Sequence, residues 1–317
     1  MKDLIKDYCR LLHVPTLLVI ALTQVLLFYK VLLPLDMTGS SMTGGDLCLL
    51  VASTLFVAMG AFVINDYYDL KIDEINRPLT RVVGKRMDKH LAMTLYISLS
   101  VVGVLLAGVL SWNSRSTFAV STCLFAVGLM WFYSSTYKRI LWLGNLLAAL
   151  VVAMVPLTVI LVNQEFLSNA AEMFGPYEQG TFVDSMGLMF FYGFTFFWIF
   201  FCWTFVAEVI KDMATEKGDR ELECHTFPIV YGVKVSKGIV YVAILLTCGV
   251  TAYFLNDRYS FQESDSLLRY YLTCTVIPAI SLVYVVYKAS SAGDYRLIAK
   301  YDLAILVLNM DYFWMEI

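Results

Sequence analysis

The amino-acid sequence predicts an all-α, polytopic membrane protein that forms a single domain over residues 1–317 and contains about nine transmembrane helices. The chain is 59% hydrophobic and only 15% charged, and its mean hydropathy is +0.70. A soluble domain has about 25% charged residues. The apolar residues also lie in blocks of about 20, the length that a helix needs to cross a bilayer. Such blocks must be helices, because an open strand would leave backbone groups unpaired in lipid.

Nine apolar blocks, each bounded by polar residues, are the predicted transmembrane helices. They lie near residues 14–33, 46–66, 91–111, 116–134, 140–162, 186–208, 236–255, 268–287 and 298–315. The first block follows Lys2, Lys6 and Arg10, as the apolar core of a secretory signal would. That block is too long for a signal peptide, and no small-x-small cleavage site follows it. We therefore expect it to stay in the protein as the first helix.

The basic residues between the blocks predict the orientation. When the N-terminus is placed in the cytoplasm, all but four of the 23 Lys and Arg residues lie in cytoplasmic segments. The four on the other side are Lys30, Arg115, Arg258 and Arg269. Cytoplasmic loops of membrane proteins carry such an excess of Lys and Arg. We therefore expect the N-terminus inside and the C-terminus outside. Because charge is sorted by membrane face, the net charge of −3 says little about partners, and we expect no nucleic acid among them.

The seven cysteines and three histidines show none of the spacings that are typical of metal ligands. Most of the cysteines lie inside apolar blocks, where a free thiol packs as a small apolar group. We therefore expect neither a zinc site nor a haem site.

A stripe of polar side chains leaves the second apolar block. Asn65, Asp69 and Asp73 are spaced four residues apart, so they share one face of a helix that continues out of the membrane. Asp66 lies on the flank of that face. Carboxylates this close repel one another and lose hydration at a membrane boundary. A cation relieves both costs, and hard oxygen ligands suit Mg²⁺, which commonly bridges carboxylates to a substrate phosphate. The alternative is a solvated helix end that merely stops the span.

A second stripe ends the sixth apolar block. Glu208, Asp212 and Glu216 repeat the spacing of four, and Asp219 follows three residues later on the same face. The sixth block stands four blocks after the second, so the two stripes occupy equivalent places on one membrane face. This suggests an internal duplication into two pseudo-repeated four-helix units, followed by one further helix. Two half-sites that hold metal across a shared diphosphate would account for both stripes.

The loop between the fourth and fifth blocks, Y133-S-S-T-Y-K-R139, reaches the same face. Tyr133 and Lys138 could bind an anionic leaving group and stabilise the charge that develops on it. Lys85 and Arg86, in an earlier loop on this face, are weaker candidates for the same role. Orientation in the membrane accounts equally well for Arg139.

These residues carry a resemblance to a known family. N65-D-Y-Y-D-L-K-I-D73 resembles the NDxxDxxxD motif of the UbiA superfamily of intramembrane prenyltransferases. E208-V-I-K-D-M-A-T-E-K-G-D219 resembles its second aspartate motif, and Tyr133 with Lys138 is similar to its Tyr/Lys loop. The chain departs from the family at two points. The second motif is usually DxxxD, whereas Thr215 stands four residues before Asp219, and the Tyr-to-Lys gap is one residue longer than YxxxK.

The resemblance implies a membrane prenyltransferase that uses Mg²⁺ to transfer a prenyl group from a polyprenyl diphosphate to a lipophilic acceptor, within membrane lipid. It also implies three overlapping sets of site residues. The catalytic set is Asp69, Asp73, Asp212, Asp219, Lys138 and Tyr133. The substrate-binding set is Asn65, Asp66, Lys85, Arg77, Glu208 and Lys211. The metal-binding set is Asn65, Asp69, Asp73, Asp212, Glu216 and Asp219. We expect Asp212 and Asp219 to matter more than Glu216.

Within the family, five segments are most similar to the branch that prenylates geranylgeranylglycerol phosphate. They are K211-D212, G218-D219, T226-F-P-I-V-Y-G232, N76-R-P78 and V82-V-G-K85. The basic loop from Arg77 to Lys89 suits an acceptor that carries a phosphate. A menaquinone-type enzyme that prenylates dihydroxynaphthoate is the alternative within the family. Outside it, the alternatives are a secondary transporter, which shares pseudo-repeats and intramembrane ionisable residues, and a purely structural membrane subunit. We expect a prokaryotic cytoplasmic membrane, with the site facing the cytoplasm.

Overall fold

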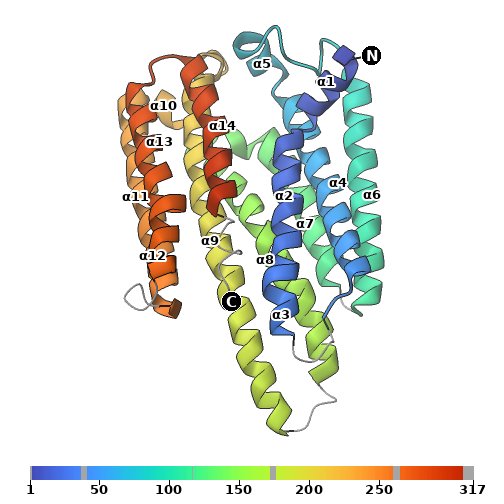
Figure 1. Ribbon diagram of the computed structural model, residues 1–317. Helices are drawn as coiled ribbons and strands as arrows, with labels where there is room; N and C mark the ends of the chain where they lie inside the picture. Colours follow the sequence, from blue (N-terminus) through green and yellow to red (C-terminus); the bar gives the residue numbers. More distant parts are fainter. Residues whose placement is uncertain (1, 37–40, 116, 172–175, 260–264, 310–317) are drawn as a thin grey trace.

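The computed structural model describes residues 2–36, 41–115, 117–171, 176–259 and 265–309, which form a bundle of long helices with shorter ones at one end (Figure 1). No strand occurs in these ranges, so the all-α prediction is confirmed. The α-helices are α1 (Lys2–Leu11), α2 (Val14–Leu27), α3 (Leu33–Leu35), α4 (Gly44–Tyr68), α5 (Leu70–Asn76), α6 (Lys89–Asn113), α7 (Phe118–Ser135), α8 (Leu143–Ala171), α9 (Pro176–Glu221), α10 (Phe227–Val230), α11 (Gly232–Tyr259), α12 (Asp265–Tyr270), α13 (Ile277–Lys288) and α14 (Ala292–Asn309). A π-helical segment, η1 (Phe28–Leu32), joins α2 to α3, and another, η3 (Tyr271–Val276), joins α12 to α13.

Eight segments in the described ranges are long and apolar enough to cross a membrane, and they match the first eight predicted blocks. They are Val14–Leu35, Gly44–Tyr68, Lys89–Asn113, Phe118–Ser135, Leu143–Asn163, Met189–Glu221, Gly232–Asn256 and Ser266–Lys288. The ninth predicted block, 298–315, begins inside α14, and its last residues lie outside the described ranges. The ninth span and the orientation therefore stay predictions.

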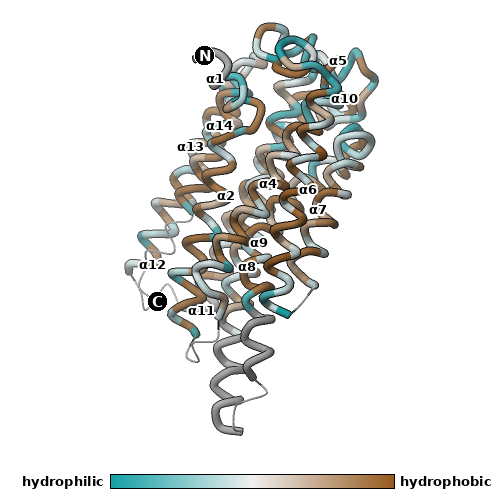
Figure 2. The backbone as a smooth tube through the Cα atoms, turned by 90° about the vertical axis from the view of Figure 1, so that its right-hand side faces the viewer, coloured by the Kyte–Doolittle hydropathy of each residue, from teal (hydrophilic) through white to brown (hydrophobic). Residues whose placement is uncertain are grey.

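The eight spans divide in chain order into two sets of four. In the first set α4 packs against α6 and α7, and in the second α9 packs against α8 and α11 and also against α14. Figure 1 shows the two sets side by side, with α1, α5 and α10 at one end of the bundle. Figure 2 shows hydrophobic residues along the helix middles and hydrophilic residues gathered at that same end. Both α4 and α9 finish there, so the two acid stripes meet at one polar end.

Small residues allow the helices of the first set to approach closely. A Cβ atom on Gly103 of α6 would stand 2.8 Å from the Val57 side chain and 3.0 Å from the Ser53 carbonyl oxygen of α4. A Cβ on Gly60 would stand 3.0 Å from the Ser100 hydroxyl. Membrane helices associate largely through such packing, because lipid is as apolar as their side chains. This close packing against α6 fixes the position of α4, which carries the start of the first acid stripe.

Large aromatic residues make α9 the core helix of the second set. Trp203, Tyr192, Phe196 and Phe200 are all fully buried on it. A buried aromatic side chain contributes more apolar contact area than other residue types. These rings pack α9 among its neighbours and position its last turns, which carry the second acid stripe, at the polar end.

The helix that carries the first acid stripe is interrupted at Asp69, the middle residue of the stripe. The sequence predicts one helix running on from the second span, but α4 ends at Tyr68 and α5 starts at Leu70, with Asp69 at the joint in a conformation outside the helical region (φ −84°, ψ 5°). The Asp69 N–H still donates to the Asn65 carbonyl at 3.0 Å, and the Asp73 N–H to the Asp69 carbonyl at 2.8 Å. The expected stripe is therefore kept, but α5 is redirected.

Candidate active site

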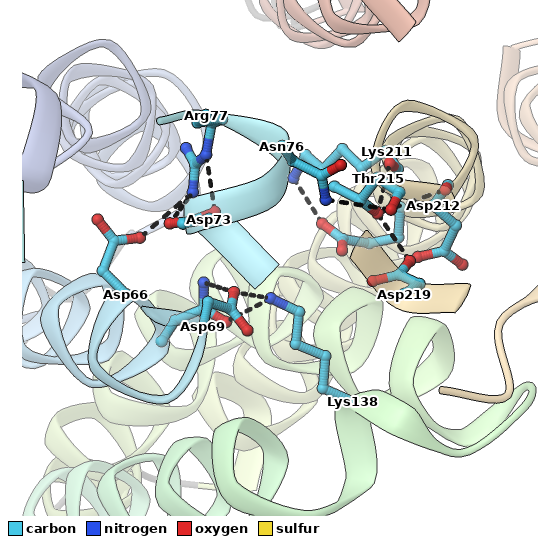
Figure 3. Close-up of polar contacts among 12 residues, drawn as sticks. Asp66, Asp69, Asp73, Asn76, Arg77, Lys138, Lys211, Asp212, Thr215 and Asp219 are labelled. Atoms are coloured by element: carbon cyan, nitrogen blue, oxygen red, sulfur yellow. Dashed lines mark hydrogen bonds and ion pairs between the residues drawn. The ribbon is translucent and has the colours of Figure 1, made fainter. Parts of the chain in front are cut away.

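The polar end of the bundle brings the expected site residues together from four elements. These are the end of α4, the short helix α5, the last turns of α9, and the 3₁₀ turn η2 (Tyr137–Arg139) in the loop after α7. Figure 3 shows Lys138 of η2 between Asp69 on one side and the acids of α9 on the other. We call Asp66, Asp69 and Asp73 the first acid cluster, and Glu208, Asp212 and Asp219 the second acid cluster.

Lys138 is tied to the α4 side of the site. Its ammonium group forms a close ion pair with Asp69 and donates to the Asn65 side-chain oxygen at 3.0 Å. Asn65 in turn donates from Nδ2 to Asp69 Oδ2 at 3.1 Å. Burial alone would lower the pKa of Lys138, but Asp69 together with Glu208 and Asp73 raises that pKa. The lysine is therefore held charged in the middle of the site.

Arg77 balances the other two carboxylates of the first acid cluster. Its guanidinium donates to both oxygens of Asp73, at 2.9 Å and 2.7 Å, and lies 3.7 Å from Asp66. Two parallel bonds of this kind are the strongest arginine–carboxylate arrangement. Burial raises the pKa of Asp73 although Arg77 opposes the rise. Burial would lower the pKa of Arg77, but Asp73 and Asp66 raise it.

Neutral groups hold two carboxylates of the second acid cluster. Asn145 of α8 donates from Nδ2 to Asp212 Oδ2 at 2.8 Å. The hydroxyl of Thr215 donates to Asp219 Oδ2, also at 2.8 Å. The third carboxylate, Glu208, accepts from Lys211 at 2.6 Å, and that lysine side chain is 54% exposed. This cluster is therefore oriented by hydrogen bonds more than by buried cations.

Tyr133 lies near both clusters. It stands in the last turn of α7, is 6% exposed, and lies within electrostatic range of Asp69, Glu208 and Asp212. A phenol in this place can donate a hydrogen bond to an anion that lies between the clusters.

Two expected site residues lie apart from the acids. Glu216 forms an ion pair with Arg220 at 2.7 Å and lines a separate cavity of about 160 Å³ with Lys217 and Tyr295. Lys85 is exposed and donates to the Pro78 carbonyl at 3.0 Å. Helix geometry explains the first case, because a residue four positions on is rotated by about 40° and so lies at the flank of the stripe.

Several residues beside the site were not expected from the sequence. Asn145 contacts Asp212 from another helix, and Asn76 contacts the backbone of α9. His13, between α1 and α2, stacks on Phe62 with ring centroids 4.6 Å apart. Its backbone is left-handed (φ 49°), and it lies within electrostatic range of Lys211, Arg77, Glu208 and Lys138. Burial lowers its pKa to about 4. No sequence pattern predicts the positive φ of His13. The roles of Asn76 and Asn145 can be recognised only from the residues that they contact in the structure.

The donor set fits a divalent cation that is shared with a ligand. Within the described ranges, no three His, Cys, Asp or Glu residues form a group that could hold a metal without other ligands. The site nevertheless holds six carboxylates against three cations, and Asp69, Asp73 and Asp219 are each only 5% exposed. Buried carboxylates need compensating charge. Oxygen donors in two separate groups match the way Mg²⁺ is held by a few carboxylates, waters and substrate phosphate.

The helical bundle with two acid clusters at one end is the arrangement that the sequence predicts for an intramembrane prenyltransferase. The model of the UbiA prenyltransferase family matches residues 36–305, and the chain belongs to this family. It is a prenyltransferase. It is 26% identical to the digeranylgeranylglyceryl phosphate synthase of Methanosphaera stadtmanae over 261 residues, 81% of this chain and 80% of that protein.

Two solved structures share the fold. A structure of digeranylgeranylglyceryl phosphate synthase aligns with a TM-score of 0.59 at 18% identity, covering 100% of this chain and 99% of the other. A UbiA homologue from Archaeoglobus fulgidus, solved with DMAPP and Mg²⁺, aligns with a TM-score of 0.59 at 14% identity, covering 95% of this chain and 99% of the other. The expected family and the expected fold class are confirmed. The roles of individual residues stay predictions.

Proposed function

We propose that this protein transfers a prenyl group from a polyprenyl diphosphate to geranylgeranylglycerol phosphate, with Mg²⁺ bound at the two acid clusters. The observation that carries the proposal is the position of Lys138, which lies between two groups of buried and half-buried carboxylates at the polar end of a membrane bundle. A diphosphate placed there meets a cation and two sets of metal ligands, while its prenyl tail extends among apolar helices.

Each residue has a definite task in this mechanism. Asn65, Asp69 and Asp73 hold the metal on one side, and Asp212 and Asp219 on the other. When bound, Mg²⁺ neutralises the diphosphate and weakens the bond from its oxygen to the allylic carbon. Lys138 and Tyr133 donate to the departing oxygens, where negative charge grows. The carbon–oxygen bond to diphosphate breaks with its electron pair on diphosphate. The acceptor oxygen then bonds to the allylic carbon and loses its proton to the diphosphate.

The identity of the acceptor is supported by relatives more than by the basic loop. Three arginines of that loop already have acidic partners in the protein. Arg77 contacts Asp73, Arg81 contacts Glu74 at 3.0 Å, and Arg86 pairs closely with Asp7. The positive charge of these arginines is therefore largely neutralised by acidic residues of the protein itself. The support comes instead from relatives such as the Methanosphaera stadtmanae protein, which is named digeranylgeranylglyceryl phosphate synthase. Lys211, which is 54% exposed beside Glu208, is the lysine of the second acid cluster that an acceptor phosphate could reach.

A competition assay tests the reaction and the acceptor together. Purified protein receives geranylgeranyl diphosphate and Mg²⁺ with either geranylgeranylglycerol phosphate or dihydroxynaphthoate, and mass spectrometry identifies the products. We expect the ether lipid as product, release of one diphosphate per product, and no reaction with EDTA. Prenylation of dihydroxynaphthoate alone would support the menaquinone-type alternative. Absence of diphosphate release with either acceptor would contradict the proposed donor and acceptor.

We also propose that the site faces the cytoplasm of a prokaryotic cell. The support is the gathering of Lys and Arg in the segments that share a membrane face with the acid clusters. A reporter that is active only in the cytoplasm should be active when it is fused to the N-terminus, and a reporter that requires the periplasm should be inactive there. Activity of a periplasm-dependent reporter at that end would reverse the orientation.

A further inference from the structure

Asn76, the last residue of α5, connects the two halves of the site. Its side-chain Nδ2 donates to the Thr215 carbonyl of α9 at 3.1 Å, and its Oδ1 accepts from the Gly218 N–H of α9 at 3.2 Å. Both polar atoms of the amide are therefore used on one turn of α9. Figure 3 shows Asn76 reaching from α5 to the helix that carries Asp212 and Asp219.

The fit of this contact is tight. Asn76 is 9% exposed. A Cβ atom on Gly218 would stand 2.5 Å from Asn76 Nδ2 and 3.1 Å from the Ile72 carbonyl oxygen, so only glycine allows α5 to approach α9 this closely. The main-chain carbonyl of Asn76, which a helix end leaves without an intrahelical donor, accepts from Arg296 of α14 at 2.8 Å. The end of α5 is thus held from two neighbouring helices.

In the part of the chain that the structure describes, Asn76 alone forms hydrogen bonds between α5 and α9. The two acid clusters otherwise belong to different four-helix sets, and α5 is a short helix after a bend at Asp69. A metal and a diphosphate shared by both clusters require a set distance between them, because Mg²⁺ demands near-ideal ligand geometry.

We propose that Asn76 is a positioning residue that sets the distance between the two acid clusters, so that both bind the same Mg²⁺–diphosphate. It does not touch the substrate itself. The proposal rests on the proposed function of the two clusters, but it predicts a mechanical effect that can be measured without turnover. Gly218 is part of the same contact, because it supplies both the N–H and the space.

The experiment compares three variants with the wild type in detergent. Asn76→Ala removes both bonds, Asn76→Asp keeps the acceptor for Gly218 but removes the donor to Thr215, and Gly218→Ala forces the helices apart. Asn113→Ala is the matched control. It removes an amide contact of similar length, 2.8 Å to Asp46, that also joins two helices but lies at the other end of the bundle. Hydrogen exchange of residues 70–76 and thermal stabilisation by a non-cleavable geranylgeranyl diphosphate analogue at graded Mg²⁺ are measured.

We expect faster exchange of α5 in Asn76→Ala and Gly218→Ala, with unchanged exchange in α4. The Mg²⁺ concentration for half-maximal stabilisation should rise about tenfold, a loss of about 1.4 kcal/mol in binding, with a smaller rise for Asn76→Asp. Asn113→Ala should leave this concentration unchanged, even if it lowers the melting temperature. A positioning residue should change the Mg²⁺ concentration for half-maximal stabilisation, whereas a purely structural residue should change only the melting temperature.

Two results would overturn the proposal. One is that a folded Asn76→Ala protein needs the same Mg²⁺ concentration for half-maximal stabilisation as the wild type. If the alanine variant does not fold, the other is an unchanged Mg²⁺ concentration for half-maximal stabilisation in Asn76→Asp. Failure of the proposed function looks different, because wild-type protein would then gain no stability from the analogue with Mg²⁺, while the exchange of α5 would still depend on Asn76.

Discussion

The two acid clusters grow out of stripes with the same spacing of four residues in sequence, yet their surroundings differ. In the first acid cluster Asp69 pairs with Lys138 and Asp73 pairs with Arg77, and both cations are largely enclosed. In the second, Asp212 is held by the amide of Asn145 and Asp219 by the hydroxyl of Thr215. The first lies at a bend between two helices, whereas the second lies on one continuous helix. Repeated spacing therefore does not mean a repeated environment.

This difference indicates that the clusters treat an incoming cation differently. In the first acid cluster a metal must compete with Lys138 for Asp69. In the second, no lysine or arginine of the described chain forms an ion pair with Asp212 or Asp219, so a metal there displaces no protein cation. We infer that the second acid cluster attracts metal, and that the first exchanges a protein cation for metal when the diphosphate arrives. The variants that follow test this contrast.

The largest effect is expected for the first acid cluster. Asp69→Ala or Asp73→Ala should lower the rate of diphosphate release about 100-fold or more, a loss on the order of 2.7 kcal/mol in transition-state stabilisation. Glu74→Ala, on the exposed face of the same helix, is the control and should keep wild-type activity. A folded Asp69→Ala protein with more than about a tenth of the wild-type rate would exclude the ligand role.

For the second acid cluster, Asp212→Ala and Asp219→Ala should each lower the rate by about 30-fold, roughly 2 kcal/mol. Glu216→Ala should change it less than about twofold, because Glu216 pairs with Arg220 and points to another cavity. All three are assayed at saturating Mg²⁺. Equal losses at the three positions would show that the spacing of four, and not the observed environment, identifies the ligands.

Lys138 distinguishes the two clusters most directly. Lys138→Met should lower kcat by about tenfold, because the departing diphosphate loses a positive donor. The same variant should lower the Mg²⁺ concentration for half-maximal rate, because Asp69 no longer has a competing cation. Arg139→Met, its exposed neighbour, should change neither. A higher Mg²⁺ requirement in Lys138→Met would contradict the exchange of cations at Asp69.

The smallest effect is expected at Thr215, where the family motif has an acid. Thr215→Asp adds a carboxylate beside Asp219, and like charges at this spacing favour a bound cation between them. The Mg²⁺ concentration for half-maximal rate should fall about threefold, roughly 0.7 kcal/mol. Thr215→Val, which only removes the hydroxyl donor to Asp219, serves as its partner variant. An unchanged Mg²⁺ requirement in Thr215→Asp would place this residue outside the metal site.

The sequence by itself determined the class of protein and the location of its chemistry. Lipid forces about 20 consecutive apolar residues into a helix, so eight spans could be predicted from hydropathy to within a few residues for most of them. Charges at span ends are costly and stand out. For this reason the segments around Asp69 and Asp212, and the loop with Lys138, were found without a structure.

Only the tertiary structure decided which partners these residues have. Local spacing put Glu216 on the acid stripe, but the packing of α14 against α9 places it beside a separate cavity that Tyr295 also lines. No local pattern in the sequence assigns a partner to Asn76 or Asn145, because their hydrogen bonds join positions 139 and 67 residues away in the chain. Lys138 meets Asp69 across 69 residues. Contacts between distant segments depend on how the helices pack, and helix periodicity carries information only about neighbours three or four residues apart.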